Sequence, residues 1–275
     1  IHQITTLPTL IENIAVRPNG HLLLTSLGNA TMTMYTINPT CPQPSASILQ
    51  IAPGSNGISG ITEILPDIYA FLAGTWNTSI RRAELGSLSI YALNLRTETP
   101  VVKKIVTIAE SVGLNGLATV PGSKNLLLAS DSVLGAVWRI DISKGTYDLA
   151  IKDSLFAPTG PAPSLGINGI RTKDNHFYFA NSAQGVFGRV AISALGKVMG
   201  PVDVLTRIDA SVGSFDDFAL DSQGNAWMAL HPKGLYFVDM EGKQKKVVNE
   251  TLLPDPTSAR FGRRDLGLQH ILYVT

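Results

Sequence analysis

The sequence Gly-Ile-Asn-Gly-Ile at residues 166–170 has a close copy, Gly-Leu-Asn-Gly-Leu, at residues 113–117. After each copy the chain turns and continues in a short apolar strand. Looser versions begin at Glu12 and at Asp216, so a polar residue opens each unit ahead of an apolar strand. Units that return roughly every 40–60 residues, each long enough for four short strands, indicate an array of small sheets. The repeat therefore predicts an all-β fold, a six-bladed β-propeller with a central channel.

The predicted units divide the whole chain between them. We expect a single β-propeller domain over residues 1–275, with units that begin near residues 12, 58, 115, 168, 216 and 257. The last unit is short, and the alternating residues 4–7 predict a further strand that closes the ring against it. Trp138 alternates within an apolar strand, so we expect it in the core. No stretch has the length and periodicity of an amphipathic helix.

The composition supports a large core and excludes several classes of partner. Hydrophobic residues make up 44% of the 275-residue chain and charged residues only 16%, so disorder is not expected. The formal net charge is +1, which gives no reason to expect nucleic acid or an anionic membrane surface as a partner. No apolar run is long enough to cross a bilayer, so we expect no membrane span.

Cysteine and glycosylation signals bear on the compartment. Cys41 is the only cysteine, so no internal disulfide can form, and no spacing of Cys and His predicts a zinc site. Asn-X-Ser/Thr sequons occur at Asn29, Asn77 and Asn249. These sequons favour the secretory pathway or secretion over the cytoplasm.

The polar residues that open the units are the first candidates for a functional site. In a propeller, the loops that enter the innermost strands converge at one mouth of the channel, so these side chains are expected to meet. We call Glu12, Asn115, Asn168 and Asp216 the polar quartet. Carboxylates and amides are hard oxygen donors of the kind that Ca²⁺ prefers. The alternative is that these Asn and Asp residues only make turns before strands.

Further candidates follow from the aromatic and ionisable residues near the ends of strands. Trp76, Phe215 and Trp227 are predicted to offer flat apolar walls to a terpene or aromatic substrate. His231 ends a strand and could polarise a carbonyl group or act as a base, or it could be a structural histidine.

Two more polar residues are weighed in the same way. Ser132 follows a strand and either belongs to a turn or contacts a substrate at the mouth. Asp217 is a candidate substrate contact, and as the neighbour of Asp216 it would raise one carboxyl pKa unless a cation lies between the two. No nucleophile elbow, Walker loop or dinucleotide fingerprint is present.

The pattern resembles the senescence marker protein/gluconolactonase/regucalcin family of six-bladed propellers. The resemblance implies a divalent metal, Ca²⁺ or Zn²⁺, at the channel mouth, with Glu12, Asn168 and Asp216 as ligands and Asn115 in contact with metal or substrate. The family usually has Glu-Gly-Pro and Pro-Asp-Gly around two of these ligands, whereas this chain has Glu-Asn-Ile at residues 12–14 and Phe-Asp-Asp at residues 215–217.

Residues 11–20, 165–170 and 257–263 resemble a fungal branch of this superfamily, encoded beside polyketide and terpenoid biosynthetic enzymes. This resemblance implies a hetero-Diels–Alderase that joins an o-quinone methide to a terpene alkene such as humulene. Such a reaction requires no cofactor. Hydrogen-bond donors would act on the quinone-methide carbonyl in an apolar pocket, and we expect the catalytic residues to be Asn115, Asn168, Asp216 and His231.

Two other functions remain open from the sequence. The first is a metal-dependent lactonase, in which a metal held by Glu12, Asn168 and Asp216 would polarise the lactone carbonyl and activate water. The second is a propeller that only binds partners, a use for which the fold is a general platform.

Overall fold

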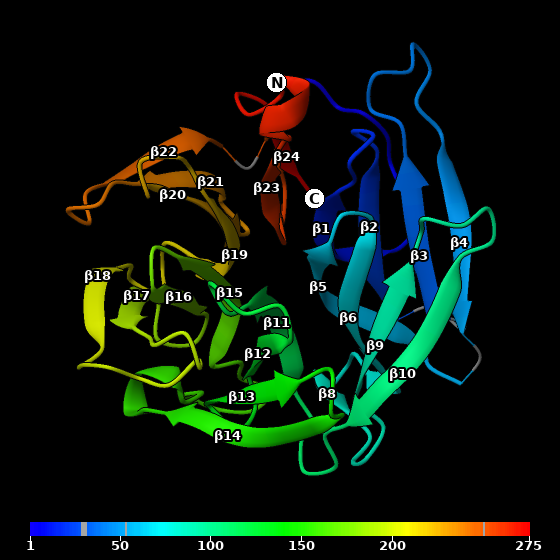
Figure 1. Ribbon diagram of the computed structural model, residues 1–275. Helices are drawn as coiled ribbons and strands as arrows, with labels where there is room; N and C mark the ends of the chain where they lie inside the picture. Colours follow the sequence, from blue (N-terminus) through cyan, green and yellow to red (C-terminus); the bar gives the residue numbers. More distant parts are fainter. Residues whose placement is uncertain (29–31, 53, 250) are drawn as a thin grey trace.

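The computed structural model describes residues 1–28, 32–52, 54–249 and 251–275. Its small sheets are arranged in a ring around a central axis, as Figure 1 shows. Five sheets have four antiparallel strands each, and a sixth position is filled by a two-stranded sheet. The prediction of an all-β propeller is therefore confirmed, and the sixth blade is the short one that the sequence indicated.

The first three blades follow one another along the chain. Blade 1 contains β1 (Leu10–Val16), β2 (Leu22–Leu27), β3 (Met32–Ile37) and β4 (Ala46–Ala52). Blade 2 contains β5 (Gly57–Leu65), β6 (Ile68–Gly74), β9 (Ser89–Asn94) and β10 (Val101–Thr107), with an inserted hairpin of β7 (Trp76–Asn77) and β8 (Arg82–Ala83). Blade 3 contains β11 (Leu114–Thr119), β12 (Leu126–Asp131), β13 (Ala136–Asp141) and β14 (Thr146–Lys152).

The remaining strands complete the ring. Blade 4 contains β15 (Ile167–Lys173), β16 (His176–Asn181), β17 (Val186–Ala191) and β18 (Asp203–Arg207). Blade 5 contains β19 (Ser214–Leu220), β20 (Ala226–His231), β21 (Gly234–Val238) and β22 (Gln244–Val248). Blade 6 contains β23 (Ala259–Phe261) and β24 (Leu272–Val274). The helices among the described residues are two short 3₁₀ turns, Ser154–Phe156 and Arg264–Leu266, so no helix there could cross a membrane.

The ring is closed differently from the sequence prediction. Residues 4–7 do not form a strand, so that prediction was wrong. Ile4 and Leu7 instead pack as partly buried side chains against a core cluster that contains Tyr35 and Tyr273. Closure falls to β23, which lies between β19 of blade 5 and β1 of blade 1 (Figure 1).

Hydroxyl groups join five of the six pairs of neighbouring blades near the inner strands. Each donates to a main-chain carbonyl of the following blade at 2.6–2.9 Å. The donors and acceptors are Thr25 to Ser59, Ser59 to Leu114, Ser132 to Ile167, Ser182 to Phe215, and Thr257 to Ile11. Between blades 5 and 6, the Asp217 amide donates to the Thr257 carbonyl at 3.1 Å. A circle of polar contacts therefore supplements the apolar packing between blades.

Apolar faces of neighbouring sheets form the core between the blades. Phe156, Phe177 and Phe179 pack together in the cluster between blades 3 and 4, with centroids of Phe156 and Phe179 4.7 Å apart. Trp138 is buried in the cluster between blades 2 and 3, as its alternation predicted. Residues alternate across the faces of each strand, so both faces of an interior sheet can bury apolar side chains.

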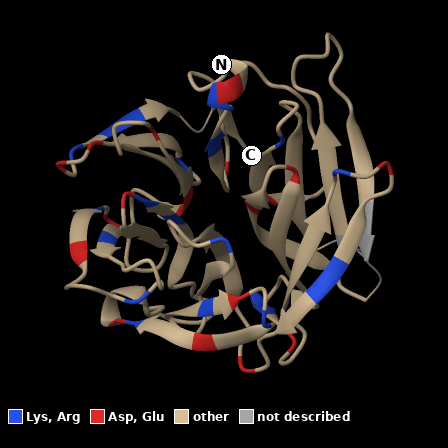
Figure 2. Ribbon diagram, viewed as in Figure 1, with Lys and Arg blue, Asp and Glu red and all other residues tan. Residues whose placement is uncertain are grey.

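Charged residues are few and lie mainly on outer strands and connections (Figure 2). Lys, Arg, Asp and Glu are intermixed around the ring in this view. Cys41 is free and exposed. Of the sequon asparagines, Asn77 and Asn249 are exposed, while Asn29 falls outside the described residues, and the secretory location stays a prediction.

Candidate functional site

A bulge at the same place in each of the first five inner strands positions the candidate residues. The register shifts occur around Glu12, Ser59, Asn115, Asn168 and Asp216 in β1, β5, β11, β15 and β19. A bulge turns the strand locally and redirects a side chain. Four of the five residues are the polar quartet, and in blade 2 the position is taken by Ser59, which is fully buried and bonded to the Leu114 carbonyl.

The glycine after each asparagine of the motif is explained by the close approach of neighbouring inner strands. A Cβ atom on Gly116 would lie 2.7 Å from the Asn168 carbonyl oxygen of the next blade. A Cβ atom on Gly169 would lie 2.5 Å from the Cα atom of Asp217. No side chain can occupy these positions without moving backbone. In each Asn-Gly pair, the asparagine therefore lines the cavity and the glycine allows the neighbouring inner strands to approach closely.

A cavity of about 530 Å³ brings the polar quartet together. All four members line it, together with His231 at the end of β20. Its apolar lining residues are Leu10, Leu27, Trp76, Leu165 and Pro232. Pockets of this size, apolar with a few convergent polar groups, are typical of sites for small molecules.

The ionisable groups of the cavity are coupled to one another. His231 Nε2 lies 2.9 Å from Asp216 Oδ2, and its Nδ1 lies 3.6 Å from Asp255 Oδ1. Burial lowers the pKa of His231, but the hydrogen bond and charge of Asp216, together with Asp255, outweigh this and raise it. Burial raises the pKa of Asp216, helped by the charge of Asp217 and opposed by His231.

Glu12 is a second carboxyl group of the cavity whose pKa is raised. Burial, followed by the charge of Asp216, raises the pKa of Glu12 to about 8, while His231 and Asn115 act in the opposite direction. The Glu12 carboxyl is therefore largely protonated at neutral pH, and a protonated carboxyl group can donate a hydrogen bond.

The two amides of the quartet lie in different surroundings. Asn115 is buried and lines the cavity. Asn168 is also buried, and its Nδ2 donates to Ser182 Oγ at 2.9 Å. Asn168 Oδ1 is buried without a hydrogen-bond partner, which is unusual for such an atom. Ser132 lines the cavity, but its hydroxyl donates to the Ile167 carbonyl, so its hydrogen bond serves the joint between blades.

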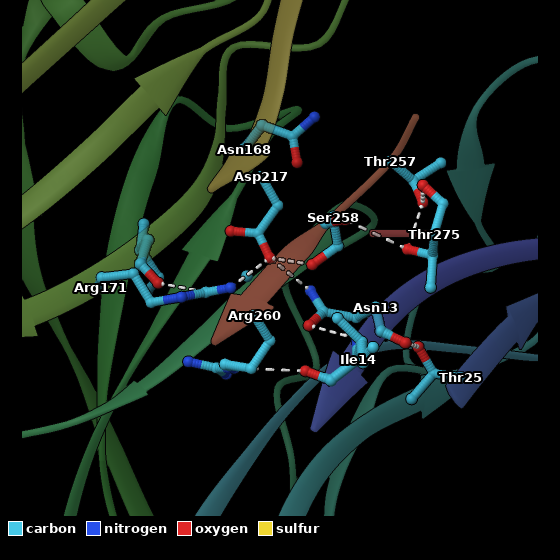
Figure 3. Close-up of polar contacts among 12 residues, drawn as sticks. Asn13, Ile14, Thr25, Asn168, Arg171, Asp217, Thr257, Ser258, Arg260 and Thr275 are labelled. Atoms are coloured by element: carbon cyan, nitrogen blue, oxygen red, sulfur yellow. Dashed lines mark hydrogen bonds and ion pairs between the residues drawn. The ribbon is translucent and has the colours of Figure 1, made fainter. Parts of the chain in front are cut away.

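Asp217 does not line the cavity and instead closes the channel behind it. Its Oδ2 atom accepts hydrogen bonds from Asn13 at 3.0 Å, Arg171 at 2.5 Å and Ser258 at 2.8 Å (Figure 3). These donors come from blades 1, 4 and 6. The prediction of Asp217 as a substrate contact is wrong, because its carboxylate is only 2% exposed and is committed to this cluster.

Two of the three predicted aromatic walls lie elsewhere. Phe215 is fully buried in the core cluster between blades 4 and 5. Trp227 packs edge-on against Phe237 and Phe261, with centroids 5.2 and 6.0 Å apart. Both predictions are wrong, since neither residue is among those that line the cavity. Trp76 does line it, held by a bond from its main-chain N–H to Asn56 Oδ1.

The inserted hairpin of blade 2 is a part of the site that the repeat pattern did not reveal. Besides Trp76, it supplies Thr78 and Arg81 to the cavity. Asp255, in the connection that leads to blade 6, is another lining residue without a sequence signal. Such residues lie on connections between blades, where neither spacing nor apolar alternation marks them.

The resemblance implied a divalent metal ion held by Glu12, Asn168 and Asp216, and the side chains of the cavity show whether such an ion would fit. Among the described residues, no group of three or more His, Cys, Asp or Glu side chains is arranged to hold a metal ion. The set of Glu12, Asn168 and Asp216 has two carboxyl groups and an amide, and its buried, unpaired Asn168 Oδ1 is an acceptor of the kind that Ca²⁺ uses. The donor chemistry therefore fits a calcium ion.

Comparison with known proteins gives distant fungal relatives. No protein-family model matches the chain. The chain is 26% identical to a protein of Phoma sp named "Putative hetero-Diels-Alderase" over 97% of its own length and 83% of that protein. It is also 26% identical to "Putative hetero-Diels-Alderase asR5" of Sarocladium schorii, over 97% of its length and 75% of that protein.

Solved structures share the fold at low sequence identity. A luciferin-regenerating enzyme matches with a TM-score of 0.65 and 16% identity over 97% of this chain and 83% of that one. Regucalcin of Agrobacterium tumefaciens matches with a TM-score of 0.62 and 14% identity over 94% and 80%. The major allergen Mala s 1 of Malassezia sympodialis matches with a TM-score of 0.69 and 12% identity over 95% and 84%. These likenesses show that the chain has the β-propeller fold, and the sequence has distant homology to the two fungal proteins.

Proposed function

We propose that the protein catalyses a stereoselective hetero-Diels–Alder cycloaddition between an o-quinone methide and a terpene alkene such as humulene. The observation that carries this proposal is the composition of the cavity, in which a carboxyl group with a pKa raised by burial and two buried amides meet apolar walls. The names of the two fungal relatives support the same class of reaction.

The polar groups would act on the carbonyl oxygen of the quinone methide. Protonated Glu12 and the amide of Asn115 are the groups that we assign as donors to this oxygen. Donors fixed in advance at the point where negative charge develops stabilise the transition state most effectively. The pair of His231 and Asp216 would hold the carboxyl group of Glu12 in a defined electrostatic setting, since both influence its pKa.

The apolar lining would bind the alkene and fix its face. Trp76, Leu27 and Leu165 offer flat and branched apolar surface to a hydrocarbon ring. A cycloaddition needs no nucleophile, and orientation of two reactants in one pocket removes much of its barrier. Stereoselectivity would follow from the fixed relation between the polar groups and these walls.

A second candidate function is a metal-dependent lactonase, and the unpaired Asn168 Oδ1 favours it. Glu12, Asn168 and Asp216 would hold a calcium ion, which when bound supplies an electrophile for a lactone carbonyl. In that case Glu12 would have to ionise, because a protonated carboxyl group is a poor metal ligand. The two functions therefore require opposite protonation states of one residue.

The test is a paired assay of the purified protein. One arm supplies a generated o-quinone methide with humulene, and the other supplies a panel of aldonolactones, each with and without EDTA. We expect an enantioenriched cycloadduct that is insensitive to EDTA. Glu12→Ala should reduce the enantiomeric excess and the yield, whereas Glu98→Gln, a change at an exposed glutamate, should not.

The lactonase would replace the cyclase if lactone opening is observed, is abolished by EDTA and is restored by Ca²⁺. A racemic cycloadduct at the uncatalysed rate, with no lactone opening, would remove both functions while leaving the fold unaffected.

A further inference from the structure

A second cavity, of about 270 Å³, lies at the other end of the inner strands. It is lined by the ends of β1, β5 and β23, through Ala15, Val16, Thr62, Glu63, Arg260, Phe261 and Arg263. Strand β1 contributes Glu12 to the first cavity and Val16 to the second. Asn13, which lies between them in β1, donates to Asp217, so the Asp217 cluster lies between the two cavities. This second cavity is thus distinct from the site proposed above.

Arg260 contributes a guanidinium group with few protein partners. Its Nε atom donates to the Ile14 carbonyl oxygen at 3.3 Å (Figure 3). Among the described residues, no other hydrogen bond and no ion pair of Arg260 is found. A guanidinium group has five N–H donors, so most of the hydrogen-bonding capacity of Arg260 is directed at no protein acceptor.

The carboxylates nearby make their hydrogen bonds with groups other than Arg260. Glu63 Oε2 pairs with Arg263 at 2.8 Å, and Glu63 Oε1 accepts from the Asp67 amide at 2.9 Å. Asp217 Oδ2 is shared by three donors that do not include Arg260. Burial, followed by the charge of Arg171, lowers the pKa of Arg260 to about 9. The charges of Asp217 and Glu63 act in the opposite direction and raise this pKa, but neither carboxylate is bonded to Arg260, so a bound anion would stabilise the half-buried cation directly.

We propose that this second cavity binds a small oxyanion, a phosphate or carboxylate group, through Arg260. A cavity of about 270 Å³ accommodates inorganic phosphate or a short dicarboxylate. The planar fork of a guanidinium group binds two oxygens of such an anion at once. Arg263 adds positive charge at the wall, and Glu63 limits the affinity by repulsion. The proposal does not depend on the reaction at the first cavity.

The experiment measures anion binding to the full chain by titration calorimetry. Inorganic phosphate and succinate are the probes, each against chloride at matched ionic strength. We expect saturable binding of at least one probe, and the preferred probe separates a phosphate site from a carboxylate site. Arg260→Gln should weaken binding about tenfold or more, because a charge-assisted contact is lost. Arg264→Gln, at an exposed arginine in the 3₁₀ turn that follows β23, is the matched control and should leave binding unchanged.

Glu63→Gln provides an independent check if Arg260→Gln does not fold. Removal of the one carboxylate among the described residues of the cavity wall should strengthen binding several-fold. Lack of saturable binding by both probes in the wild type would overturn the proposal. Equal affinity in the wild type and Arg260→Gln, or no gain in Glu63→Gln, would do the same.

Discussion

Gly169 lies directly against Asp217 of the next blade, so close that a Cβ atom on the glycine would stand 2.5 Å from the aspartate Cα. The neighbour is backbone and cannot turn aside. Gly169→Ala should therefore destabilise the protein by about 3 kcal/mol, as overpacking of a rigid site does. Urea denaturation measures the loss. Gly200→Ala is the control, because a Cβ atom there meets nothing within 4 Å, and an equal loss in both variants would contradict the explanation.

The Asp217 cluster should depend on charge as well as shape. Asp217→Asn leaves Arg171 as a buried cation without its partner, and removal of one member of a buried pair costs about 3–5 kcal/mol. Asp148→Asn breaks the ion pair with Arg139, but Asp148 is 54% exposed, so the cost should stay below about 1 kcal/mol. Thermal unfolding of both variants measures the two losses of stability. Similar losses would show that burial does not determine how much an ion pair contributes to stability.

Glu12 should make stability depend on pH in a defined window. Its pKa is raised by folding from 4.5 to about 8, so the folded state prefers the protonated form. The stabilisation is fully present below pH 4.5 and is lost as the pH rises to about 8. Glu12→Gln removes this titration, so the stability difference between wild type and variant should shift in favour of the variant across that window. A constant difference would mean that Glu12 titrates normally.

Calcium offers a separate measurement on the same residue. If a calcium ion binds the quartet, its charge would lower the pKa of Glu12, and the pH dependence just described should disappear when Ca²⁺ is added. For the cyclase we expect the dependence to persist at all calcium concentrations. The melting temperature, followed against pH with and without Ca²⁺, distinguishes the two without any substrate.

The two tryptophans assigned alike from the sequence should behave differently. Trp76→Ala removes a wall of the first cavity, so it should lower cycloadduct formation and enantiomeric excess with a modest effect on stability. Trp227→Ala removes contacts with Phe237 and Phe261 and should cost up to about 3–5 kcal/mol while the folded variant keeps its selectivity. Loss of selectivity in Trp227→Ala alone would reverse these assignments.

The repeat made much of this architecture predictable. Asn115 and Asn168 could be found because each precedes a glycine that the close approach of the neighbouring strand requires. The asparagine and the glycine together make a motif that is recognisable in the sequence. Glu12 and Asp216 could be predicted as site residues because they occupy the same position in their repeat units as the two asparagines. Phe215 and Asp217 were misassigned because a register shift between Phe215 and Phe218 redirects side chains, and spacing does not show which of three adjacent residues turns toward the cavity.

Other features depended on contacts between distant parts of the chain. Residues 4–7 alternate like a strand, yet they do not pair with the last blade, which among the described residues consists of β23 and β24. Alternation indicates which side of a segment is apolar, but it does not show whether the segment pairs with a strand. Ile4 and Leu7 are partly buried against the core, although their segment is not part of a sheet. Arg81 and Asp255 reach the cavity from connections, where composition carries little information.

The hydroxyl bonds between blades have a consequence for how this site can change over time. Four of the five end on main-chain carbonyls, those of Ile11, Leu114, Ile167 and Phe215, each immediately before a member of the polar quartet. A main-chain carbonyl can accept the same hydrogen bond whichever side chain the next residue carries. Substitutions at the quartet can therefore accumulate one blade at a time without loosening the ring, and one scaffold can give rise to binders of quite different reactants.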